Sequence, residues 1–175
     1  MKKILIVVDM QNDFINGSLG TKEAEGIIDQ VVAKIKEYPP NQIYVTLDTH
    51  SVNYLQTAEG NKLPVEHCIS GTPGWELNER VKESLTDSIN IEKPTFGSYA
   101  LVDQIHSLYQ ETKSLLEIEL IGLCTDICVI TNALLLKTKM PEVLIKVNSS
   151  CCAGVTPESH AAALLVMKMC QIEVN

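Results

Sequence analysis

Short runs of apolar and β-branched residues recur along the chain, and each is long enough for one strand. Within these runs polar side chains rarely alternate with apolar ones, which is typical of strands covered on both faces. The sequence therefore predicts six buried strands, at about 3–8, 42–47, 88–91, 115–121, 143–147 and 171–174.

Helical patterns lie between most of these runs. Apolar residues recur three and four positions apart from Ile27 to Ile35, and Pro39 and Pro40 end that pattern. The last helix has Thr156 as its expected N-cap, followed by a proline suited to the first helical position. Further helices are expected at about 75–85, 99–109, 125–139 and 157–169.

This alternation of strands and helices predicts an α/β fold, in which helices cover both faces of a parallel sheet. No repeat or linker interrupts the pattern, so residues 1–175 are expected to form one domain. The stretch 48–74 has no clear periodicity. A loop of that length within a compact domain is usually functional.

Charge and composition exclude several classes of partner. Lys and Arg number 14 against 22 Asp and Glu, for a net charge of −8, which argues against nucleic acid and anionic membranes. No apolar run approaches the roughly 20 residues of a membrane span. The first run stops at Asp9 without a cleavage signal, so we expect a cytoplasmic protein. Its six cysteines are then expected to be free thiols.

Polar groups follow the first four predicted strands. They are Asp9, then Asp48 with His50, then Lys93, and finally the segment 122–128 (GLCTDIC). Because ligands of open α/β sheets bind beyond the carboxyl ends of the strands, we expect these groups to share one site.

Cys128 is the best nucleophile candidate in this set. It falls in the first turn of the helix predicted to begin near Thr125, where the helix N-terminus favours a thiolate. Lys93 would add positive charge, and Asp9 could accept the thiol proton and return it to a leaving group. Amides between Cys124 and Cys128 could stabilise an oxyanion.

The long second loop carries possible metal ligands. Asp48 and His50 project to the same side of an extended segment, and Glu59 and His67 could complete a site of nitrogen and oxygen ligands. Such a set suits Zn²⁺, Fe²⁺ or Mn²⁺. The pairs Cys124/Cys128 and Cys151/Cys152 are weaker alternatives.

Each of these residues also has a structural interpretation. Cys128 could be a small buried hydrophobe, Asp9 a strand cap and Lys93 a solvated charge, while the two histidines could hydrogen-bond within their loop. The joint occurrence of all of them after consecutive strands favours a functional site.

The segments 9–14 (DMQNDF), 93–96 (KPTF) and 122–129 (GLCTDICV) resemble the isochorismatase-like cysteine hydrolase superfamily, whose best-known amidases are nicotinamidases and pyrazinamidases. The resemblance spans nearly the whole chain. It implies a three-layer α/β/α domain with a six-stranded parallel sheet. It also implies a catalytic triad of Cys128, Asp9 and Lys93, and an oxyanion hole formed by the amides of Cys124 and Cys128. A cis Leu123–Cys124 bond is expected for the same reason.

The resemblance further implies that Asp48, His50 and His67 bind a metal beside the triad. Gln56 stands where many members have another histidine, whereas Glu59 matches the glutamate of other members. A divalent metal is thus expected, Zn²⁺ foremost, with Mn²⁺ and Fe²⁺ as alternatives.

The expected substrate pocket departs from the nicotinamidase pattern at one point. Phe14 matches one aromatic wall, but Leu63 and Pro64 occupy the stretch where a tryptophan is common. Tyr54 or Trp75 could replace that ring.

Three functions are compatible with these residues. The first is hydrolysis of a small amide of nicotinamide type to acid and ammonia, through a thioester on Cys128. The second is hydrolysis of another amide or a ureido acid, for which Lys62 and Arg80 are the nearest cations. The third is a non-catalytic binding or redox-sensing protein. A homo-oligomer is expected, for which the apolar positions 134–136 and 164–166 are candidate contacts.

Overall fold

The computed structural model describes residues 2–111 and 116–175, which build one six-stranded, all-parallel sheet. The strand order is β3-β2-β1-β4-β5-β6, so the first strand in the sequence lies between β2 and β4. The strands are β1 (Lys2–Val8), β2 (Ile43–Asp48), β3 (Ile89–Lys93), β4 (Leu116–Leu123), β5 (Leu144–Ala153) and β6 (Glu173–Val174).

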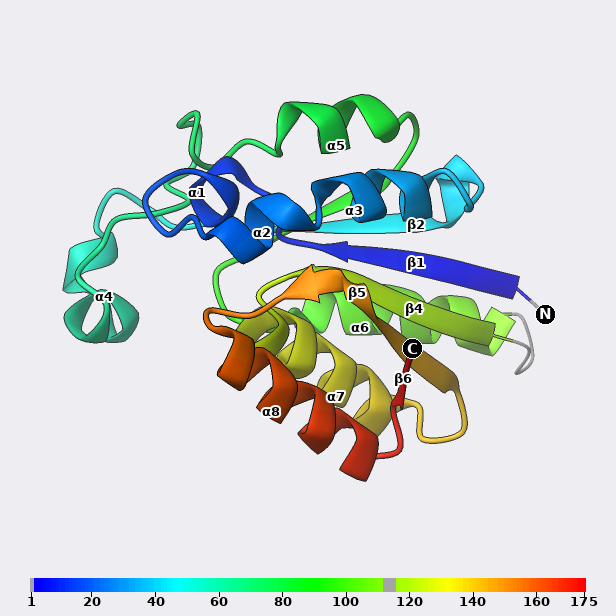
Figure 1. The fold of residues 1–175 in the computed structure, drawn as a ribbon. Coiled ribbons are helices and arrows are strands. Elements are labelled where there is room, and N and C mark those ends of the chain that lie inside the picture. The colour runs from blue at the N-terminus through cyan, green and yellow to red at the C-terminus, as the bar shows by residue number, and fades with distance from the viewer. Residues whose placement is uncertain (1, 112–115) are drawn as a thin grey trace.

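Helices cover both faces of the sheet, as predicted (Figure 1). The helices α1, α2, α3 and α5 lie over one face, and α6, α7 and α8 over the other, while α4 stands out beside the sheet's end. Their bounds are α1 (Asn12–Ile15), α2 (Lys22–Gly26), α3 (Ile28–Ile35), α4 (Ala58–Lys62), α5 (Glu79–Ser84), α6 (Tyr99–Glu111), α7 (Ile130–Lys139) and α8 (Pro157–Met169).

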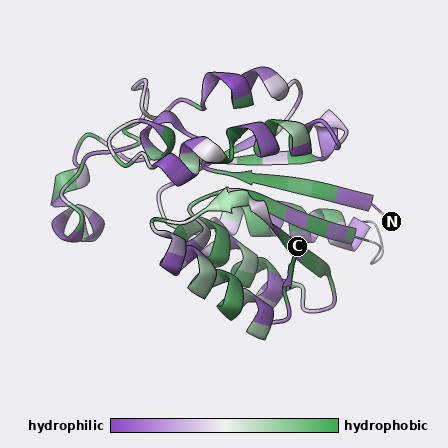
Figure 2. Cartoon of the chain, viewed as in Figure 1, coloured by the Kyte–Doolittle hydropathy of each residue, from purple (hydrophilic) through white to green (hydrophobic). Residues whose placement is uncertain are grey.

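Alternate residues of β1 supply the two halves of the core. Ile4 and Ile6 pack with α6 and α7 on one face, whereas Leu5 and Val7 pack with α3 on the other. All four are fully buried, which explains the continuous apolar run, and Figure 2 shows β1 as apolar along most of its length. Burial on two faces therefore fixes this strand at the middle of the sheet.

Several predicted bounds need correction. The helix expected at 75–85 is reduced to α5, because Trp75 and Glu76 lie in a turn and a bend, and Leu77 bridges to Gln11 in the chain that follows β1. Asn12 N–H donates to the Glu76 carbonyl, and Asn78 N–H donates to the Met10 carbonyl. The stretch 48–74 is not featureless, since it holds a 3-10 turn (Tyr54–Gln56) and α4.

The strands β4 and β5 both extend beyond their predicted ends. The expected start of β4, Leu115, lies outside the described residues. β5 continues six residues past Val147 through a polar stretch, so the apolar pattern did not predict this part of the strand. Its pairing with β4 shifts register between Leu120 and Gly122, which lets the strand continue past the irregularity.

The predicted helix 125–139 has two parts. Residues Thr125–Val129 form a π-helical turn, and α7 follows it. In this turn the Val129 N–H donates to the Cys124 carbonyl, five residues back, at 3.0 Å. Such wide turns are uncommon and concentrate at functional sites.

None of the helices described is both long enough and apolar enough to cross a membrane. All six cysteines are free thiols, as expected.

Gly122 allows β4 and β1 to approach closely at the end where the polar residues gather. Its φ is +113°, and a Cβ there would lie 2.1 Å from the Val8 carbonyl oxygen.

We expect Gly122→Ala to lower the free energy of unfolding by at least about 2 kcal/mol, measured by urea denaturation. Gly26→Ala is the matched control, because a Cβ there meets nothing within 4 Å. A Gly122→Ala protein as stable as the control would contradict this account.

Candidate active site

The polar residues expected to form a site do meet at the carboxyl end of the sheet. Asp9 follows β1, Asp48 ends β2 and Lys93 ends β3, while Cys128 lies in the π-helical turn after β4. β1 and β4 are neighbours, and the chain continues from β1 toward one side of the sheet and from β4 toward the other. Open α/β sheets form their ligand crevices at such a point.

Lys93 lies at the centre of the cluster and is 1% exposed. Its Nζ is 2.7 Å from Asp9 Oδ2, 3.2 Å from Asp48 Oδ1 and 3.4 Å from Cys128 Sγ. Burial opposes its charge, but the negative charges around it prevail and raise the pKa of the lysine well above its ordinary value. Lys93 is therefore a permanently charged ammonium, and not a solvated surface charge.

Asp9 is completely buried beside this ammonium. Thr46 Oγ1 donates to Asp9 Oδ1 at 2.6 Å, whereas Oδ2 has the ion pair with Lys93 but no well-aligned hydrogen-bond donor among the described residues. Burial raises the pKa of Asp9, against the lowering effect of Lys93. A buried carboxylate with a raised pKa is suited to accept a proton.

The Cys128 thiol is buried against the same two residues. Burial raises the pKa of Cys128 well above its usual value, the charge of Asp9 raises it further, and Lys93 opposes both. Burial thus opposes the expected effect of the helix N-terminus, which favours the thiolate. Activation then requires a base, and Asp9 is the nearest candidate, because Asp9 and the thiol both contact Lys93 Nζ.

The turn that carries Cys128 is held by its own backbone and by Asn132. The Cys124 carbonyl accepts hydrogen bonds from the N–H groups of Ile127 and Val129. The Cys128 N–H, which lies between them in the sequence, does not donate to this carbonyl. Asn132 Nδ2 donates to the Cys128 carbonyl at 2.8 Å. The Leu123–Cys124 bond is cis, as expected.

Asp48, His50 and His67 form a compact, buried group whose possible ligand atoms lie within 4.8 Å of one another. Nε2 of His50 is 2.9 Å from Asp48 Oδ2, and Nε2 of His67 is 3.7 Å from the same oxygen. Glu59 Oε1 approaches His67 Nε2 to 3.8 Å from α4. One carboxylate oxygen and two imidazole nitrogens thus point at a common position.

This group fits a divalent metal. His67 Nδ1 hydrogen-bonds to the Val65 carbonyl at 2.9 Å, which leaves Nε2 free to bind, in the arrangement typical of metal-binding histidines. The site contains three carboxylates, from Asp9, Asp48 and Glu59, and the ammonium of Lys93 pairs with the first two. Two negative charges remain, and a divalent cation would balance them.

A cavity of about 640 Å³ opens beside these groups. Phe14 and Leu63 line it, together with Phe96 of the 93–96 motif and Val155, which the sequence did not single out. Cys124, Cys128, Asp48, Glu59 and His67 also reach its wall. The chemistry of the site therefore lies on one side of a largely apolar chamber.

Tyr54 and Trp75 are not among the cavity-lining residues, in contrast to their expected role. Tyr54 is fully buried behind the metal group, with its ring 4.8 Å from that of His50 and 4.9 Å from that of His67. Trp75 Nε1 donates to Thr49 Oγ1. Both aromatic residues support the loop that carries the histidines.

Gln11 is a positioning residue that sequence reasoning missed. Its fully buried side chain donates to the Asp48 carbonyl at 2.8 Å and accepts from the Asp48 N–H at 2.7 Å. It thereby pairs with the end of β2 as another strand would. A polar residue two positions after Asp9 was the available signal, but its partner cannot be read from the sequence.

With this geometry established, comparison with known proteins identifies the class. The Isochorismatase domain family model matches residues 3–174, so the chain belongs to the isochorismatase family, as its motifs predicted. The six-stranded parallel sheet with helices on both faces is the fold of that family's solved members.

Individual relatives carry more specific names. An uncharacterized isochorismatase family protein PncA of Bacillus subtilis is 30% identical, over 94% of this chain and 93% of its own. The nicotinamidase/pyrazinamidase of Mycobacterium tuberculosis is 24% identical, over 98% and 97%. A crystal structure of nicotinamidase/pyrazinamidase PncA from B. subtilis superimposes with a TM-score of 0.82, at 29% identity and with 99% of both chains covered. Pyrazinamidase of Pyrococcus horikoshii in complex with zinc gives 0.79, at 25% identity, covering 100% of this chain and 99% of that one.

The hydrogen bonds of Gln11 to Asp48 predict a role in metal affinity. We expect Gln11→Leu to weaken Zn²⁺ binding about 10- to 100-fold, measured by competition with a chelating dye, because outer partners orient metal ligands. Asn12→Ala is the control, since Asn12 makes only an exposed side-chain bond to Pro73. Equal Zn²⁺ affinity in both variants would show that Gln11 does not position Asp48.

Proposed function

We propose that this protein is a nicotinamidase-type cysteine amidohydrolase, which converts a small amide to its acid and ammonia with a divalent metal in the substrate pocket. The observation that carries the proposal is the position of Lys93 Nζ, which contacts Asp9, Asp48 and Cys128 at once. That contact joins a nucleophile and base to a group able to bind a metal. The nicotinamidase relatives indicate a hydrolase acting on amide C–N bonds.

The proposed reaction begins with the thiol of Cys128. Asp9 accepts the thiol proton as Sγ attacks the amide carbonyl, and Lys93 stabilises the charge that develops. Amides of Cys124 and Cys128 would donate to the oxyanion. Asp9 then gives the proton to the leaving nitrogen, ammonia departs and a thioester remains. Water, deprotonated by Asp9, cleaves the thioester to release the acid and regenerate the thiol.

Asp48, His50, His67 and Glu59 would hold the metal, for which we propose Zn²⁺. Mixed imidazole and carboxylate ligands suit this ion, with Mn²⁺ and Fe²⁺ as alternatives, and the Pyrococcus relative was solved with zinc. When bound, the ion supplies a Lewis-acidic anchor for a ring nitrogen of the substrate. Phe14 lies beside this position, with its ring 5.5 Å from that of His67, and would pack on an aromatic substrate.

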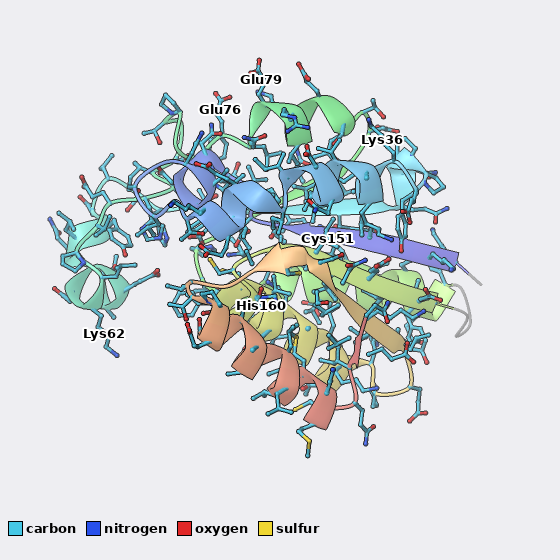
Figure 3. The ribbon with its side chains drawn as sticks, viewed as in Figure 1. Lys36, Lys62, Glu76, Glu79, Cys151 and His160 are labelled. Atoms are coloured by element: carbon cyan, nitrogen blue, oxygen red, sulfur yellow. The ribbon has the colours of Figure 1, made fainter. Side chains whose placement is uncertain are left out.

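A ureido acid would need a cation for its carboxylate, and the two candidates are poorly placed. Arg80 pairs with Asp29 and is not among the cavity-lining residues. Lys62 does line the cavity, but it comes from α4, which stands out beside the sheet's end, and Figure 3 shows its side chain extending from that helix. The uncharged amide is therefore the favoured substrate class.

A non-catalytic role is disfavoured as well, because Asp9, Lys93 and Cys128 are all present and in contact.

Loss of the nucleophile provides the first test. We expect Cys128→Ala to lower ammonia release from nicotinamide at least about 1,000-fold, because the thioester cannot form. Cys170→Ala is the control, since that exposed thiol lies at the end of α8. Ammonia release by Cys128→Ala at the wild-type rate would disprove the proposed nucleophile.

Metal removal provides the second test. Chelation is expected to abolish nicotinamide hydrolysis and to lower the thermal midpoint, because a bound ion stabilises the native state. Zn²⁺ should restore both in wild type but not in His50→Ala. Full activity of metal-free protein would argue against ring-nitrogen coordination and move the search to other small amides.

A further inference from the structure

The cavity beside the reacting groups is larger than nicotinamide requires. Even if every non-hydrogen atom of nicotinamide took the roughly 30 Å³ that a water molecule occupies in the liquid, the molecule would fill less than half of the cavity's volume of about 640 Å³. Cavities of this size hold ligands as large as drug molecules. The remaining space can therefore receive a second part of the substrate.

Three half-exposed apolar side chains line this cavity. Leu63 is 38% exposed, Phe96 46% and Val155 51%, and they come from separate segments, after α4, after β3 and after β5. Exposed apolar residues are ordinary when scattered, but a group of them around one cavity indicates a ligand-binding surface. We call these three residues the apolar rim.

The apolar rim is preorganised, because a polar side chain holds the backbone at each of its positions. The three hydrogen bonds run from Tyr54 Oη to the Leu63 carbonyl at 3.0 Å, from Asn132 Nδ2 to the Phe96 carbonyl at 3.2 Å, and from the Val155 N–H to Asp126 Oδ1 at 3.2 Å. Loops that are fixed before a ligand arrives lose little entropy when it binds. The rim is thus suited to bind a ligand and not merely to border the cavity.

The reacting groups lie deeper in the protein than the apolar rim. Asp48, His67 and Cys128 line the same cavity, but each of them is buried. A substrate held by these groups can extend only toward the solvent, where the rim lies. The rim offers an aliphatic, an aromatic and a β-branched side chain without charge, so an uncharged apolar group complements it best.

We propose that the apolar rim is a second substrate subsite and, resting on the proposed function, that the substrate is a pyridine-3-carboxamide with an apolar group on ring carbon 5. In the proposed function the ring nitrogen faces the metal group and the carboxamide carbon meets Cys128. Carbon 5 is the only ring position adjacent to neither the nitrogen nor the carbon that bears the carboxamide. A group at carbon 5 therefore points away from both anchors and toward the rim.

Steady-state ammonia release by the Zn²⁺-loaded enzyme tests the subsite. We expect kcat/KM for 5-phenylnicotinamide to exceed that for nicotinamide at least about tenfold, because burial of the phenyl ring stabilises the bound state. The control probe, 6-phenylnicotinamide, is equally apolar but carries its phenyl group beside the ring nitrogen, so it should be a poorer substrate than nicotinamide. Equal kcat/KM for nicotinamide and 5-phenylnicotinamide would overturn the subsite and leave the proposed function intact.

A variant that fills the subsite should remove this preference. We expect Leu63→Trp to lower the ratio of kcat/KM for 5-phenylnicotinamide to kcat/KM for nicotinamide at least about tenfold, because the indole takes the space of the phenyl group. Leu55→Trp is the matched control, since Leu55 is exposed and is not among the cavity-lining residues, and it should keep the wild-type ratio. A wild-type ratio in Leu63→Trp would contradict the placement of the phenyl group at the rim.

Equilibrium binding separates failure of the subsite from failure of the proposed function. Calorimetry with Zn²⁺-loaded Cys128→Ala, which requires no turnover, should give a dissociation constant at least about tenfold lower for 5-phenylnicotinamide than for nicotinamide. Tighter binding of 5-phenylnicotinamide without ammonia release by wild type would support the subsite and contradict the proposed function. Equal dissociation constants would overturn the subsite whatever the rate of hydrolysis.

Discussion

The site depends on one buried ammonium. A charge removed from water is costly unless it is paired, and Lys93 is paired with two carboxylates that come from different strands. Lys93 itself contacts both Asp9 and the Cys128 thiol, and Asp48 connects the lysine to the two histidines. The proposed nucleophile and the proposed metal ligands are thus linked, because they share the ammonium of Lys93. Loss of the lysine would leave two carboxylates buried without compensation.

The sequence was sufficient to predict the four strand ends that carry Asp9, Asp48, Lys93 and Cys128. Continuous apolar runs mark strands buried on both faces, and a charged residue where such a run ends shows where the strand meets the site. The pattern failed where long-range pairing decides the structure. Leu77, which lies within the predicted helix 75–85, instead bridges to the chain after β1, and Gln11 binds a residue 37 positions away. The π-helical turn was missed because helical periodicity does not distinguish one additional residue per turn.

Burial gives the nucleophile a particular chemical character. Burial raises the pKa of Cys128 and so favours the protonated thiol, from which the proposed base Asp9 would accept the proton. Oxidants attack the thiolate, so a protonated and buried thiol is shielded from them between turnovers. This state is the opposite of what a redox sensor needs. The apolar chamber around the site also keeps the local dielectric low, which strengthens the interactions that Lys93 makes.

The central place of β1 has a consequence for synthesis of the chain. β1 leaves the ribosome before the other strands of this sheet, yet it must pair with β4 as well as β2, and β4 begins more than a hundred residues later. Until then, one edge of an almost wholly apolar strand has no partner. Unpaired apolar edges recruit strands from other molecules, so the interval before residue 116 emerges is when this protein is most exposed to aggregation. The need for chaperones during synthesis is therefore expected to depend on β1, the first strand, and not on β6, the last.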